Sequence, residues 1–147
     1  MARPIRLLAV ALIAASTLSY EILLVRIFAI EYFYHFAYMT IGVAMLGFGA
    51  SGTLLALFGK PDRSAAEAGF TWSVVLTSLA LVASPTLVQQ ISLDPTQLAW
   101  NSGQWLRLAL VYCLLALPFS VGAMGILLGL VLSSTRPGTT YGASFVG

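Results

Sequence analysis

In this chain of 147 residues, only 8% of the side chains are charged and 59% are hydrophobic, with a mean hydropathy of +0.94. A soluble domain of this size carries about 25% charged residues, so the composition excludes an ordinary soluble protein and predicts one that contacts membrane lipid. The net charge of +2 is too small to indicate nucleic-acid binding. A single cysteine, Cys113, excludes an internal disulfide.

Four apolar segments are long enough to cross a bilayer, for which a helix needs about 20 residues. They lie at residues 5–30, 36–58, 70–90 and 105–133. Because backbone polar groups must be paired within lipid, these segments are predicted to be helices rather than open strands. The sequence therefore predicts an all-α, multi-pass membrane bundle with four transmembrane helices in a single domain, residues 1–147.

The first span contains two charged residues, Glu21 and Arg26. A charge at the centre of a spanning helix costs about 2.5–3.5 kcal/mol on insertion scales, and such residues are candidates for function. The two are five residues apart, about 140° around a helix, so they do not share a face. The alternatives to a functional role are a structural ion pair with another group and an Arg26 side chain that extends to the outer surface.

Around the turn from the first span to the second, Glu31, His35 and Tyr38 follow helical spacing and would share a face. A lone histidine in a membrane could ligate a haem or a pigment, with Glu31 nearby, but zinc and iron sites need more ligands. The alternative is an interfacial polar histidine. The sequence predicts no metal and no cofactor, and it leaves a haem or pigment at His35, or a bound lipid, as the alternative.

Small residues recur four apart in two of the spans. They are Gly47 and Ser51 in the second, and Gly125, Gly129 and Ser133 in the fourth. Small residues at this spacing let a second helix approach closely. The pattern predicts a helix-packing face, either within the chain or against a partner chain.

The positive-inside rule predicts the orientation. When four helices alternate, five basic residues fall on one side: Arg3, Arg6, Lys60, Arg63 and Arg136. The loop at residues 92–103, on the opposite side, contains no Lys or Arg. Both termini are therefore expected in the cytoplasm. Trp72, Trp100 and Trp105 are expected near helix ends, in an aromatic belt. The apolar residues 141–147 predict the start of a fifth helix, as in a piece of a longer protein.

Three stretches of the sequence are informative together. Residues 19–26 read SYEILLVR, residues 42–57 are dense in small residues, and residues 117–125 contain an LP…G pattern. Together with residues 141–147, these stretches resemble the membrane part of bacterial proteins fused to a spermidine-synthase-like domain. The resemblance implies a major facilitator-like helix bundle in the bacterial inner membrane, with Glu21 and Arg26 as the family's paired charges. The Gly motif and catalytic carboxylates of the family's soluble domain are absent, so no enzymatic activity is implied.

The sequence as a whole predicts a non-catalytic integral membrane protein. Its expected role is an accessory or structural subunit that packs against larger membrane partners and contacts lipid. One alternative is a transporter-like module, or half of one, in which Glu21 and Arg26 lie near a substrate path and a kink at Pro118 acts as a gate. The other is the membrane anchor of an aminopropyltransferase-like enzyme.

Overall fold

The computed structural model describes residues 3–31, 34–59, 61–91, 97, 100–133 and 137–146, and these ranges form a helical bundle without a strand. The all-α prediction is confirmed. The helices are α1 (Arg3–Glu31), α2 (Tyr34–Phe58), α3 (Arg63–Val88), α4 (Ser102–Leu132) and α5 (Pro137–Val146). The first four are long and apolar enough to cross a membrane. The expected fifth helix is present as the ten-residue α5.

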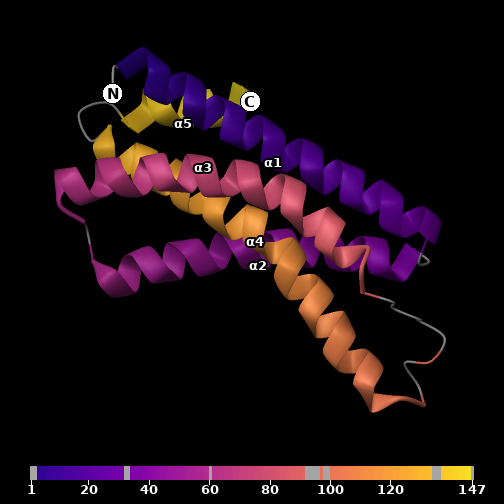
Figure 1. Ribbon diagram of the computed structural model, residues 1–147. Coiled ribbons are helices and arrows are strands. Elements are labelled where there is room, and N and C mark those ends of the chain that lie inside the picture. The colour runs from indigo at the N-terminus through magenta and orange to yellow at the C-terminus, as the bar shows by residue number, and fades with distance from the viewer. Residues whose placement is uncertain are drawn as a thin grey trace.

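Successive helices run in alternating directions (Figure 1). One end of the bundle therefore holds the starts of α1, α3 and α5 and the ends of α2 and α4. Gly59 follows α2 with a φ of 75°, a left-handed conformation that glycine adopts without steric cost. Of the basic residues predicted to share a side, Arg6 and Arg63 lie at this end, whereas Lys60 and Arg136 lie outside the described residues.

Helix α4 is the centre of the bundle and contacts each of the other four helices. Its buried residues occur on more than one face, from Leu108 and Leu115 to Leu128. It changes direction near its middle, so that its first half diverges from the other helices (Figure 1). Pro118 lies close to that middle and is buried; a proline there removes a backbone hydrogen bond and bends the helix.

The inner faces of α1 and α3 follow a spacing of three and four residues, which is one side of a helix. The buried residues of α1 include Val10, Ile13, Thr17, Tyr20, Leu24 and Phe28, and those of α3 are Ala66, Phe70, Ser73, Thr77 and Ser84. These inner faces combine large apolar residues with hydroxyl-bearing and small ones, while other large apolar residues such as Leu12 and Leu79 are exposed. Outward-facing leucines suit a surface in contact with lipid.

Helix α3 begins at Arg63, seven residues before the predicted start at Phe70. Residues 64–68 precede the apolar run and read SAAEA, which favours a helix, so α3 extends back to Arg63. Trp72 consequently lies about 5 Å from the midpoint of α3, at about 1.5 Å per residue, rather than near its end. Trp100 and Trp105 do lie at the beginning of α4, and both are exposed.

Candidate functional site

Glu21 lies on α1, four residues after Thr17, the middle residue of Arg3–Glu31. At about 1.5 Å per residue, it is about 6 Å from the midpoint of the helix. In a helix centred in a bilayer, that is inside a hydrocarbon core about 30 Å thick. The side chain is partly exposed, and its carboxylate has no hydrogen-bond or ion-pair partner within the described part of the chain.

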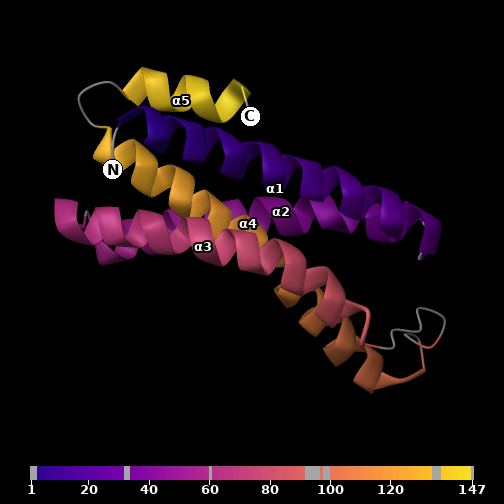
Figure 2. The ribbon, with the colours of Figure 1, turned by 45° about the horizontal axis from the view of Figure 1, so that its top comes forward.

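A groove of about 390 Å³ lies beside Glu21, between four helices. Its surface is mainly apolar, with two hydroxyl-bearing residues, and it is lined by Thr17 and Leu18 of α1, Phe48 of α2, Ile126 of α4, and Ser144 and Phe145 of α5. Helix α5 supplies one wall because it packs along the first half of α1 (Figure 2). The fold thus places a carboxylate at the edge of an apolar groove.

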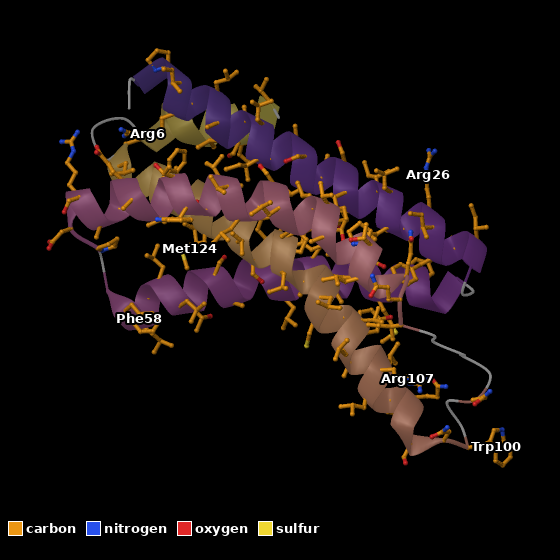
Figure 3. All side chains as sticks on the ribbon, viewed as in Figure 1. Arg6, Arg26, Phe58, Trp100, Arg107 and Met124 are labelled. Carbon is orange, nitrogen blue, oxygen red and sulfur yellow. The ribbon has the colours of Figure 1, made fainter. Side chains whose placement is uncertain are left out.

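Arg26 does not meet Glu21. It lies nine residues after the midpoint of α1, which is about 13 Å along the axis and close to the edge of the hydrocarbon core. Its side chain is exposed and points away from the bundle (Figure 3). No ion pair of Arg26 occurs among the described residues. A long basic side chain at this depth reaches the membrane surface.

A different pair of charges links helices at the opposite end of the bundle. The Arg6 side chain is only 9% exposed, and its Nη2 lies 3.7 Å from Oε1 of Glu67 on α3. Its Nη1 donates to the backbone carbonyl of Leu132 at 3.3 Å, where α4 ends. The negative end of a helix dipole favours a cation there. Arg63 also lies 3.7 Å from Glu67.

Glu67 was not among the residues predicted from the sequence to have a role. The available signal was that Arg6 and Glu67 each lie near the start of a helix, and that both helices start at the same end of an alternating bundle. Opposite charges at equal depth on two such helices are candidates for a contact. The ion pair joins α1 to α3, and the hydrogen bond from Arg6 to Leu132 joins α1 to α4 at the same end of the bundle.

The small residues of α4 face α1 and α3. A methyl group added at Gly125 would lie 2.8 Å from Oγ of Ser73, and one added at Gly129 would lie 2.8 Å from Cγ2 of Val10. Both distances are too short for real Cβ atoms, so these glycines allow close approach of the helices. Ser133 follows α4 as its C-cap residue, and its N–H donates to the Leu130 carbonyl at 3.0 Å.

Helix α2 has two faces with small residues. Gly47 faces α4, since an added Cβ would lie 2.7 Å from Cβ of Phe119. Ser51 is buried, and its hydroxyl donates to the Phe48 carbonyl at 2.7 Å. Gly42 and Gly49, by contrast, have no atom within 4 Å of an added Cβ. Gly47 and Gly49 are about 200° apart around the helix, which puts them on opposite faces.

The open face of α2 carries a shallow hollow of about 680 Å³, which Gly42, Leu46, Gly49, Thr53 and Leu54 help to line. Leu54 also borders a groove of about 290 Å³ between α2 and α3, with Trp72 and Met124 among its lining residues. Met124 points from α4 into the space between the two outer helices (Figure 3). The open face of α2 therefore continues into this groove.

Tyr20 forms a polar contact inside the bundle. Its hydroxyl lies 2.6 Å from Oγ of Ser84 on α3, and its ring centroid lies 5.5 Å from that of Phe119 on α4. The hydrogen bond satisfies two hydroxyls that are shielded from water. Tyr20 therefore positions α1 against both neighbours directly beside Glu21.

The proposed ligand pair Glu31 and His35 has side chains outside the described residues, and the two residues belong to different helices, α1 and α2. Tyr38, the third residue of that pattern, is 73% exposed. Within the described part of the chain, no three His, Cys, Asp or Glu side chains gather in a way that could hold a metal ion.

Comparisons with models of protein families, with curated proteins and with solved structures find no match to this chain.

Proposed function

We propose that this chain is a non-catalytic integral membrane subunit that packs, through the open face of α2, against a helix of a larger membrane protein. The observation that carries the proposal is the contrast between the glycines. Other helices of this chain pack closely against Gly47, Gly125 and Gly129, whereas no atom lies within 4 Å of a Cβ added at Gly42 or Gly49. Small residues on one face of a membrane helix favour close association with another helix.

A transmembrane helix is the occupant that fits this surface. Gly42, Leu46, Gly49 and Thr53 recur at spacings of four, three and four, so they form one continuous stripe along α2. The hollow along this stripe and the groove that begins at Leu54 are mostly lined by apolar residues. An apolar helix would fill both without burying an unpaired polar group.

The proposed location is the bacterial cytoplasmic membrane, with the start of α1 and the end of α4 on the cytoplasmic side. Support comes from Arg6 and Arg63, which lie near the starts of α1 and α3, at the end of the bundle where α4 ends. Basic residues beside apolar spans are retained on the cytoplasmic side.

The docking proposal is tested by photocrosslinking in native membranes. A photoreactive amino acid at Gly49 should give an adduct with a larger membrane protein. The same residue at Leu79, which is 61% exposed on α3, should give lipid adducts only. Gly49→Leu should remove the partner from the purified complex. An adduct of two copies of this chain, or no protein adduct at Gly49, would contradict the proposal.

A second candidate function is a transport module, and the position of Glu21 favours it. A carboxylate beside a groove, about 6 Å from the helix midpoint, is typical of ion and proton pathways in membranes. This candidate predicts solute uptake by vesicles that contain the purified chain. Glu21→Gln should abolish that uptake without loss of folded protein, and equal uptake by the variant would exclude the role.

A further inference from the structure

We propose that the groove beside Glu21 binds an apolar organic cation of single positive charge, whose charged centre lies against the Glu21 carboxylate. This inference deepens the second candidate function, because it names the ligand class of the same groove. It concerns binding alone, and it is independent of any partner at α2.

The carboxylate is the first reason for a cationic ligand. Glu21 has no hydrogen-bond donor or ion-pair partner among the described residues. The adjacent hydroxyl of Thr17 donates to the Ile13 carbonyl at 2.8 Å, so its hydrogen is directed along α1 rather than toward Glu21. A carboxylate in an environment of low dielectric gains most from a nearby positive charge.

The walls of the groove are the reason for an organic ligand. A volume of about 390 Å³ is in the range of pockets for small organic molecules. Leu18 and Ile126 provide aliphatic surface, and Phe48 and Phe145 provide two phenyl rings. Aromatic rings attract cations that have shed their water. A groove with one carboxylate and apolar walls therefore fits a ligand that has one positive charge surrounded by hydrocarbon groups.

The two phenyl groups differ in how firmly they are held. Phe48 packs against Phe119, with ring centroids 6.4 Å apart and an interplanar angle of 48°. Phe145, on α5, is 86% exposed. Removal of the Phe145 ring therefore alters the groove without removing a buried side chain, which makes this position suitable for a test.

The test uses tritiated tetraphenylphosphonium and the purified chain in lipid nanodiscs, with tetraphenylborate as a competitor of nearly the same shape and opposite charge. Wild type should bind the phosphonium saturably, and the borate should not compete. Glu21→Gln should weaken binding by about tenfold or more, as expected for loss of about 1.4 kcal/mol. Phe145→Leu should weaken it about threefold.

Asp62→Asn is the matched control, since it removes one negative charge from an exposed residue before α3. It should bind the phosphonium like wild type. Equal affinity of wild type and Glu21→Gln, or equal loss in Asp62→Asn, would overturn the proposal. Binding without uptake by vesicles would retain the proposal and remove the transport function.

A second measurement needs no variant. A hydrophobic carbodiimide modifies carboxyl groups within membranes, and mass spectrometry of the wild-type chain gives the rate at Glu21. Tetraphenylphosphonium should slow this modification at least fivefold, while tetraphenylborate should leave it unchanged. An unchanged rate with the phosphonium present would overturn the proposal even if Glu21→Gln did not fold.

Discussion

Close packing at single glycines determines how near the helices of this bundle approach. Gly129 of α4 lies against Val10 of α1 and Phe70 of α3, and a methyl group there would be 2.8 Å and 3.4 Å from their side chains. Without a hydrophobic driving force between helices in lipid, such contacts contribute much of the association energy. The same residue type at Gly49 makes no such contact.

Gly129→Leu should therefore lower the free energy of unfolding by about 1–3 kcal/mol, the range for overpacked cores. Gly49→Leu is the matched control on the isolated chain. It should leave stability unchanged or raise it by up to about 1 kcal/mol, because glycine is a poor helix former. Circular dichroism during titration from mild detergent into dodecyl sulfate measures both values. Equal stability of Gly129→Leu and wild type would contradict the packing shown by the structure.

At the scale of the helices, the long apolar runs in the sequence were sufficient to predict the four spans, because polar turns separate these runs. The start of α3 was not predictable in this way, since its first turn extends past the apolar run into polar residues. The sequence also did not predict which helix packs against the inner face of each span. Gly125 and Gly129 have a recognisable spacing, but contact with α1 and α3 depends on the arrangement of all four helices. The resemblance to the spermidine-synthase-like membrane proteins stays a prediction.

The contact between α1 and α3 gives a prediction at this scale. Tyr20→Phe and Ser84→Ala each remove one side of a hydrogen bond of 2.6 Å. In a double-mutant cycle the two should show a coupling of about 0.6–1.7 kcal/mol, as for interhelical hydrogen bonds in membranes.

Ser78→Ala is the control for this cycle. The Ser78 hydroxyl is exposed and donates to the Val74 carbonyl of its own helix at 3.0 Å. Its cycle with Tyr20→Phe should therefore give no coupling. Additive effects of Tyr20→Phe and Ser84→Ala, measured by the same detergent titration, would mean that the hydrogen bond does not stabilise the bundle.

One side of the molecule is covered by an additional helix, and another side has an uncovered groove. Helix α5 covers the first half of α1 (Figure 2), whereas α2 and α3 flank α4 with a groove between them. The Glu21 groove lies where α1, α2, α4 and α5 meet. The sequence identified Glu21 by its charge within an apolar run. The groove, however, also requires Phe145, which is 124 positions away in the sequence and which only the folded arrangement brings close to Glu21.

The orientation of this molecule in the membrane is the final prediction. Asp62 precedes α3 at the end that carries Arg6 and Arg63, and Ser102 begins α4 at the other end. Both side chains are exposed. In a Cys113→Ala background, which removes the native thiol, Ser102→Cys should react with an impermeant maleimide on intact cells. Asp62→Cys should react only after the cells are permeabilised. Because the positive-inside rule depends on Lys and Arg beside the spans, the reverse pattern would mean that the basic end faces outward and that the proposed orientation is wrong.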